Sequence, residues 1–146
     1  MGLFDWLLGK GKKEPETAEE APAGGSAAFK ISHKFSPLRL KAHQDSKVNM
    51  TVKLRNVSGS KQLVSADVIL PKGKKVGFDV TYMSKHHEER LGELENGESK
   101  SFPVTIHGGP VTTRGEVPVK ITAYAHYLNY RKVLEETSKT AKLRII

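Results

Sequence analysis

The fold of this chain is decided by ten residues, KVNMTVKLRN, at positions 47–56. Apolar side chains fill every second position from Val48 to Leu54, and lysine, asparagine, threonine or arginine fills the positions between them. Successive side chains of a β-strand point to opposite faces, so this period of two predicts a strand with one buried face and one face in water. We therefore expect a β-sheet protein.

The same alternation recurs on both sides of this stretch. Upstream, the predicted inward residues are Phe29, Ile31, His33 and Phe35 and, after a break at Pro37, Leu38 and Leu40. Downstream they are Ala66, Val68 and Leu70; Phe78, Val80 and Tyr82; Phe102, Val104 and Ile106; and Val117, Val119, Ile121, Ala123, Ala125 and Tyr127. Between Tyr82 and Phe102 the alternation is interrupted by a polar stretch, residues 84–90, which the short apolar pair Leu91 and Leu94 follows. The final segment, residues 132–146, can pair with residues 115–127 as a last strand.

Turn residues separate these runs. They are NVSGS at 56–60, KGKK at 72–75, NGE at 96–98 and HGGP at 107–110. Seven or eight short strands with no convincing helix predict an antiparallel β-sandwich over residues 28–146. Pro103 and Pro118 fall inside strands and indicate edges or bulges, because proline cannot donate a ladder hydrogen bond.

Three stretches of this region resemble a known kind of module. They are FSPLRLKAHQDSKVNMTVKLRNVSGSKQLVSADVILP (35–71), LGELENGESKSFPVTIHGG (91–109) and RGEVPVKITAYAHY (114–127), and the second contains an L-x-x-L-x-x-G-E phrase at Leu91, Leu94, Gly97 and Glu98. Together they resemble the immunoglobulin-like modules of archaeal and bacterial proteins, of the CARDB and NEW3 types. The resemblance implies a prokaryotic protein with an adhesion, scaffolding or spacer role and no catalytic residues.

The first ten residues differ from the rest of the chain. On a helical wheel their large apolar side chains cover an arc of about 200°, and lysines follow them. An aromatic-rich apolar face followed by lysines is typical of a helix lying in the membrane interface. We expect residues 1–10 to form an amphipathic segment that binds anionic membrane through Leu3, Phe4, Trp6, Leu7, Leu8, Lys10, Lys12 and Lys13. Docking of this segment onto a protein partner, or onto the chain's own sandwich, stays open.

A linker separates this segment from the strands. Residues 11–27 are rich in proline, alanine, glycine and glutamate and show no apolar periodicity, which predicts a flexible tether. The chain therefore divides into a membrane-targeting segment (1–10), a linker (11–27) and a sandwich (28–146).

Charge favours anionic partners. Residues 28–146 hold 21 lysines and arginines against 11 aspartates and glutamates, and such a balance attracts phospholipid headgroups or nucleic acid. Lys72, Lys74 and Lys75 form a candidate anion contact, although a solvated turn is the simpler explanation for them. Tyr124, Tyr127 and Tyr130, near Arg131 and Lys132, are the best case for nucleic-acid binding.

The sequence contains few residue patterns that would indicate catalysis or metal binding. The chain has no cysteine, which excludes disulfides, zinc–thiolate sites and thiol nucleophiles. The adjacent His86 and His87 cannot easily hold one ion, because neighbouring side chains diverge. No nucleophile elbow, Walker loop or dinucleotide fingerprint occurs. We expect no enzyme activity, no cofactor and no metal, a core position for His33 and an exposed one for His126.

These observations predict a non-catalytic peripheral membrane adaptor or scaffold. We expect it in the cytoplasm, reversibly bound to the inner face of the cell membrane, because no apolar run reaches the ~18 residues of a membrane span and no secretory signal is apparent. Its sandwich would recruit a protein partner, and a homo-oligomer is compatible with this role. The alternatives are an exported immunoglobulin-like binding module and a basic nucleic-acid-binding protein.

Overall fold

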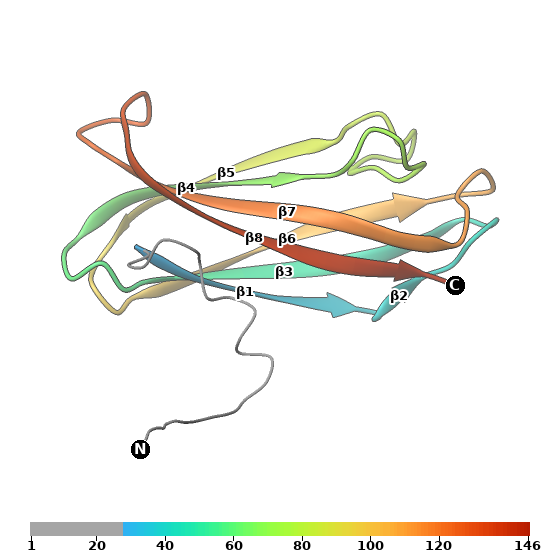
Figure 1. Ribbon diagram of the computed structural model, residues 1–146, viewed down its shortest axis with the longest axis horizontal. Helices are drawn as coiled ribbons and strands as arrows, with labels where there is room; N and C mark the ends of the chain where they lie inside the picture. The colour runs from blue at the N-terminus through green and yellow to red at the C-terminus, as the bar shows by residue number, and fades with distance from the viewer. Residues whose placement is uncertain (1–27) are drawn as a thin grey trace, which may run out of the picture.

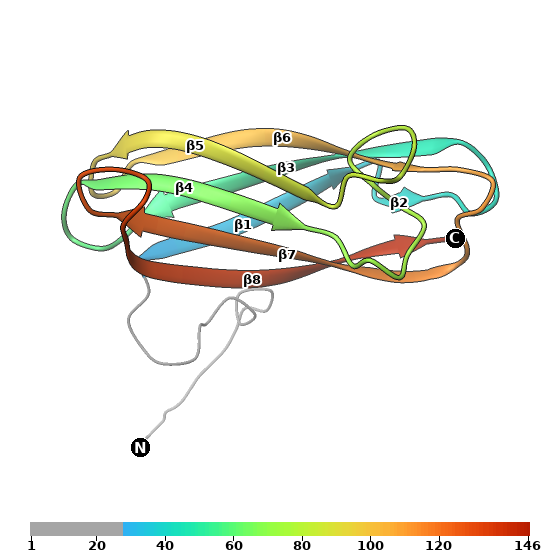
Figure 2. The same cartoon turned by 90° about the horizontal axis from the view of Figure 1, so that it is seen from above.

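The computed structural model describes residues 28–146, which form two β-sheets packed face to face (Figures 1 and 2). The strands are β1 (Phe29–Ser36), β2 (Arg39–Leu40), β3 (Ser46–Asn56), β4 (Gln62–Ile69), β5 (His86–Leu94), β6 (Ser99–Gly108), β7 (Gly115–His126) and β8 (Val133–Ile145). These described residues hold eight strands and no helix, so the predicted all-β class is confirmed. The predicted amphipathic helix of residues 1–10 lies outside the described residues.

One sheet has three strands in the order β1-β3-β6, and the other has five in the order β2-β8-β7-β4-β5. All pairings are antiparallel except that of β2 with β8. Strands distant in sequence are therefore neighbours, as β3 and β6 are, because the chain crosses between sheets. The predicted pairing of residues 132–146 with residues 115–127 is confirmed.

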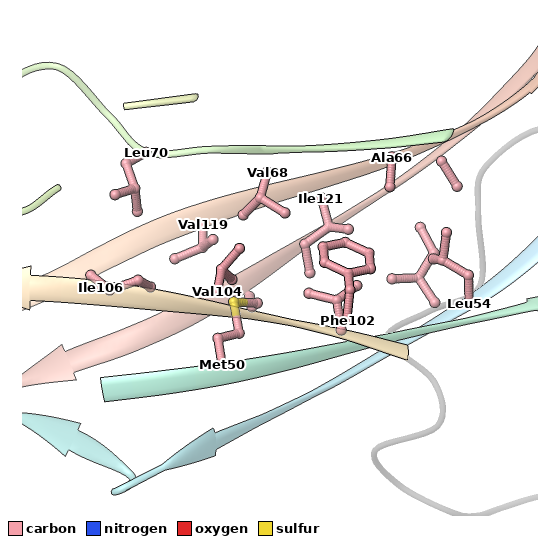
Figure 3. Close-up of a cluster of buried hydrophobic side chains, with 14 of the residues drawn as sticks. Met50, Leu54, Ala66, Val68, Leu70, Phe102, Val104, Ile106, Val119 and Ile121 are labelled. Atoms are coloured by element: carbon pink, nitrogen blue, oxygen red, sulfur yellow. The ribbon is translucent and has the colours of Figure 1, made fainter. Parts of the chain in front are cut away.

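The core lies between the two sheets (Figure 3). The alternating residues of β3, from Val48 to Leu54, are fully buried. Figure 3 shows Met50 and Leu54 in the layer that also holds Val68, Val119 and Ile121 of the opposite sheet. Each buried leucine, isoleucine or valine contributes about 1.5–3 kcal/mol relative to exposure. The period of two in the sequence therefore places the core correctly.

Loops gather at the two ends of the sandwich. The near end holds Ala28, where the described chain begins, together with the β3–β4 turn and the β7–β8 loop, residues 127–132 (left in Figure 1). The far end holds residues 70–85 and the β6–β7 turn (right in Figure 1).

One predicted strand is wrong. Residues 78–82 form a loop at the far end, where Asp79 accepts hydrogen bonds from the backbone N–H groups of Met83 (2.9 Å) and Ser84 (3.0 Å). Tyr82 adopts a left-handed φ of 62°, and Val80 is 71% exposed. The Asp79 side chain replaces a ladder partner, so the chain turns although its apolar residues alternate.

The missed strand is β5, which begins in the polar stretch at His86. It is an edge strand paired only with β4, so few of its side chains face the core and its sequence carries little apolar signal. Both predicted apolar residues in it, Leu91 and Leu94, are buried.

Three single predictions are also corrected. Leu38 is 72% exposed because it precedes β2 at the crossing between sheets. Tyr127 is exposed because β7 ends at His126. His126 is only 6% exposed, because it lies under the β7–β8 loop on the outer side of the five-stranded sheet.

Both strand prolines sit where no hydrogen-bond donor is needed. Pro103 lies in β6, an edge strand, as predicted. Pro118 lies in β7, which has neighbours on both sides, but β4 pairs with β7 only as far as Lys120. At Pro118 the strand has β8 alone as a partner, so the position is locally an edge.

Candidate functional site

The outer side of the three-stranded sheet is strongly basic. The residues that alternate with the core positions of β1 and β3 are exposed, and the antiparallel register brings those of the two strands side by side. We call this surface the basic face. Its cations are Lys30, Lys34, Lys47, Lys53 and Arg55.

No carboxylate interrupts the basic face among the described residues. Apart from its five cations, the outward positions of β1, β3 and β6 hold only uncharged side chains and one histidine: Ser32, Ser36, Asn49, Thr51, Ser99, Ser101, Pro103, Thr105 and His107. Within residues 28–146, none of the five cations forms a salt bridge. No carboxylate of the described residues neutralises their charge.

Two cations of this face oppose each other directly. Lys30 of β1 is the register partner of Arg55 of β3, and Cβ atoms of such partners lie about 4.5–5.5 Å apart. Like charges at that separation destabilise the strand pair. An anion bound over this pair would relieve the repulsion.

A hollow of about 470 Å³ adjoins the far end of the basic face. Lys47 and His107, which are register partners, line it together with Tyr82 and Asp45. The tyrosine is held close to Gly109, where an added Cβ would lie 1.6 Å from its hydroxyl oxygen. The hollow can take a small polar group, and Asp45 contributes a carboxylate to its lining.

The second predicted basic cluster, Lys72, Lys74 and Lys75, forms the turn after β4 at the far end. Lys85 braces this turn by donating to the carbonyls of Lys74 (2.7 Å) and Val76. Burial, and then the nearby Lys75 ammonium, lowers the pKa of Lys85 from its usual 10.5. The cluster therefore belongs to a loop of the five-stranded sheet and not to the basic face.

The predicted membrane-binding residues at positions 3–13 lie outside the described residues. The described chain begins at Ala28 and enters β1, an edge strand of the sheet that carries the basic face. The sequence that precedes Ala28 is therefore joined to the sandwich at an edge of the basic face. No helix within residues 28–146 is long and apolar enough to cross a membrane.

The paired histidines behave as neighbours on a strand. His86 lies near Asp67 of β4 (Nε2–Oδ1 3.2 Å), whereas His87 contacts Glu89 of its own strand (Nε2–Oε1 3.0 Å). Residues 28–146 contain no group of three side chains placed to hold a metal ion. His33 is half-buried, with its ring edge-on to Phe35.

Sequence reasoning missed a buried Ser–His pair on the outer side of the five-stranded sheet. Ser65 Oγ lies 2.7 Å from Nε2 of His126, and the carbonyl of Lys132 lies 3.2 Å from Nδ1. Because a carbonyl only accepts, Nδ1 carries a proton, and in the neutral ring Nε2 accepts from the serine hydroxyl. These are the residue types of an activated nucleophile, but both are buried. We assign them a structural role, which is to fasten the β7–β8 loop.

Tyr130 completes this fastening. Its ring packs edge-on against His126 at 5.2 Å, its hydroxyl accepts from the N–H of Gly92 (3.1 Å), and Arg90 stacks over its face. Nearby, burial, and then the charge and hydrogen bond of Asp67, raises the pKa of Tyr124 above its usual 10.0. The β7–β8 loop is therefore held to β5 by specific contacts, and two of the three tyrosines considered for nucleic-acid stacking are occupied within the protein.

Comparison with known proteins identifies a fold and no family. No protein-family profile and no curated protein matches this chain. The native conformation of E. coli alpha-2-macroglobulin is similar with a TM-score of 0.55 at 10% identity over 83% of this chain, which spans only 7% of that protein. The C-terminal domain of Wzt is similar with a TM-score of 0.51 at 9% identity, covering 90% of this chain and 83% of that one.

At such identities the likeness shows the fold alone. Both similar structures contribute β-sandwich domains of the immunoglobulin-like kind, so the described residues have an immunoglobulin-like fold. The predicted resemblance is confirmed at this level. Its finer assignment to the CARDB or NEW3 type stays a prediction.

Proposed function

We propose that this chain is a non-catalytic peripheral membrane adaptor whose basic face lies against an anionic bilayer. The observation that supports this most is a sheet face with five cations and, among the described residues, no carboxylate. Each lysine or arginine near an anionic membrane surface contributes about 1 kcal/mol. The face and the apolar N-terminal segment then act as two weak contacts on one membrane, which together give stable but reversible binding.

The composition of the face favours lipid over nucleic acid. Proteins that bind single-stranded nucleic acid stack bases on exposed aromatic rings between their cations. The outward positions of β1, β3 and β6 carry no phenylalanine, tyrosine or tryptophan. A surface of lysine, arginine, serine and threonine suits phosphate headgroups, and the apolar residues needed for insertion come from Leu3 to Leu8.

The linker and the opposite sheet complete the adaptor. A flexible linker of about 17 residues, as the composition of residues 11–27 predicts, would span roughly 20–25 Å, enough for the sandwich to rest on the membrane near its own anchor. With the basic face on lipid, the five-stranded sheet faces away from the bilayer. That sheet carries mixed charge and is the surface we assign to a protein partner, in a CARDB-like or NEW3-like scaffolding role on the cytoplasmic side.

Co-sedimentation of the full chain with anionic and neutral vesicles tests this function. We expect Trp6→Glu to abolish binding and leave the sandwich folded. Reversing Lys30 and Lys53 to glutamate should weaken binding to anionic vesicles by at least about thirtyfold, because two contacts of about 1 kcal/mol each are lost and each glutamate adds repulsion. The matched control reverses Lys72 and Lys75, which changes net charge equally in the far-end turn.

Two results would contradict the proposal. Equal weakening by both pairs of substitutions would mean that net charge, and not the basic face, directs binding. Failure of the wild-type chain to bind any vesicle, combined with strongly salt-dependent binding to short DNA or RNA, would favour the nucleic-acid alternative.

A further inference from the structure

A groove with a partly apolar and partly polar lining lies at the near end of the sandwich, and its polar side is formed by Ser60, Lys61, Gln62, Glu93 and His126. Its volume is about 510 Å³, within the range of about 300–1,000 Å³ of small-ligand pockets. Large apolar side chains line it from three elements, namely Leu63 of β4, Tyr127 and Leu128 of the β7–β8 loop and Leu134 of β8. Tyr127, Leu128 and Leu134 are all more than half exposed.

The backbone under this groove is costly to maintain. Leu128 adopts a left-handed φ of 67° and is 76% exposed. Glycine or asparagine adopts that conformation more readily. Exposure of the leucine side chain to water also provides no stabilising burial. Because the contacts of Ser65, His126 and Tyr130 anchor the loop to the sheet, the leucine is displayed on a preorganised surface. A strained, exposed and well-supported apolar residue indicates a binding role.

The chain itself supplies a fitting occupant. The sequence before the strands contains one cluster of large apolar side chains, Leu3 to Leu8, and the described chain begins at Ala28, at the same end of the sandwich as the groove. The carbonyl of Ala28 accepts from the N–H of Val57, in the same turn whose Ser60 lines the groove. A tether of about 17 residues spanning roughly 20–25 Å therefore reaches the site without leaving the near end.

We propose that, away from membranes, residues 3–8 of the same chain dock in this groove with Trp6 as the principal anchor. Docking covers the apolar segment in water, and a membrane competes with the groove for it. Short flexible tethers give effective concentrations of about 1 mM. A groove affinity of about 0.1 mM would then keep the segment docked about ten times more often than free, and would weaken apparent membrane affinity about tenfold.

Trp6 is the chain's single tryptophan, so its fluorescence reports docking without lipid. The test variant combines Leu128→Asn, which suits the left-handed backbone, with Leu134→Thr. The control combines Met83→Gln with Val111→Thr, which removes two exposed apolar side chains at the far end. We expect blue-shifted, quencher-protected emission from the wild-type chain and the control. Red-shifted, fully quenchable emission is expected from the test variant, with unchanged thermal unfolding.

Vesicle affinity distinguishes this proposal from one in which the loop itself inserts into the membrane, because the two predict opposite changes in the test variant. The test variant should bind anionic vesicles about tenfold more tightly, because its segment is always free; this part of the inference rests on the proposed function. Tighter vesicle binding without any change in the protection of Trp6 from quencher would overturn the proposal. Weaker vesicle binding would also overturn it, and would show that the loop itself contacts lipid. Quenchable Trp6 in the wild-type chain would also overturn it.

Protection that rises with protein concentration would place the segment on a second copy of the chain and contradict docking within one molecule. If neither the wild-type chain nor any variant binds vesicles, the proposed membrane function fails. The fluorescence measured in buffer still decides the docking.

Discussion

At the scale of single residues, buried or shielded polar side chains set the shape of the turns. Asn56, the last residue of β3, is fully buried, and its amide donates to the carbonyls of Ser60 (2.7 Å) and Leu94 (2.9 Å) while its oxygen accepts from Ser58. One side chain therefore ties the β3–β4 turn to the end of β5. The sequence predicts a turn at this asparagine, but its link to a residue 38 positions away follows only from the fold.

Asp79 shapes the far-end loop in the same manner, and its protonation gives a prediction. Hydrogen bonds from Thr81 and from the backbone of Ser84 and Met83 lower the pKa of Asp79 below 3.8. The contribution of the ionised Asp79 to the stability of the folded loop is therefore present above pH 3.8, and it is lost as the pH falls through the lowered pKa of Asp79. We expect the amide resonances of Met83 and Ser84 to titrate with a midpoint below 3.8. A midpoint above that value, or a titration that persists in Asp79→Asn, would contradict this assignment.

At the scale of elements, close packing decides which loops tolerate change. Gly77 is buried and forms an isolated bridge with His107 of β6. A Cβ built there would lie 2.6 Å from the Tyr82 Cα, whereas one at Gly73 meets nothing within 4 Å. The two glycines lie in the same loop, and only the packing of the folded loop distinguishes them.

Alanine substitution tests this difference. Gly77→Ala should lower the free energy of unfolding by about 1–3 kcal/mol, because the backbone of Tyr82 must move. Gly73→Ala should leave it within about 0.5 kcal/mol. Chemical denaturation of both variants measures the effect, and similar values for the two would show that the loop does not pack as described.

Strand pairing gives a second prediction at this scale. Lys30→Glu converts the like-charge pair with Arg55 into an opposite-charge pair, which is worth about 0.2–1 kcal/mol relative to an uncharged one. The free energy of unfolding should therefore rise by about 1 kcal/mol, while affinity for anionic vesicles falls. Chemical denaturation and vesicle co-sedimentation measure the two effects. A variant that is both less stable and a weaker binder would place Lys30 in a structural role instead.

At the scale of the whole molecule, charge is sorted between two sheets. The three-stranded sheet presents cations alone among the charged groups on the outward side of its strands, whereas the five-stranded sheet mixes both signs, as in the ion pairs of Lys61 with Glu93 and of Arg90 with Glu88. This sorting distinguishes the face that we assign to the membrane from the face that we assign to a protein partner. The net charge of the chain alone does not tell which face is basic.

Salt dependence checks this sorting. Raising ionic strength from about 0.1 M to 1 M shortens the screening length from about 10 Å to about 3 Å. The vesicle affinities of the wild-type chain and of the variant with Lys30 and Lys53 reversed should therefore converge at high salt. Weak binding through the apolar segment should remain. A difference that persists at about 1 M would mean that the substitutions act on structure and not on surface charge.

Local periodicity and turn chemistry were enough to predict the all-β class, most of the strands and the buried residues within them. Prediction from the sequence failed where side-chain contacts override that periodicity, as at Asp79 and His126, and where an edge strand such as β5 has little apolar signal. The basic face and the near-end groove were decided only by the tertiary structure. Lys30 and Arg55, or Leu63 and Leu128, become neighbours when strands distant in sequence pair, and no local pattern encodes that pairing.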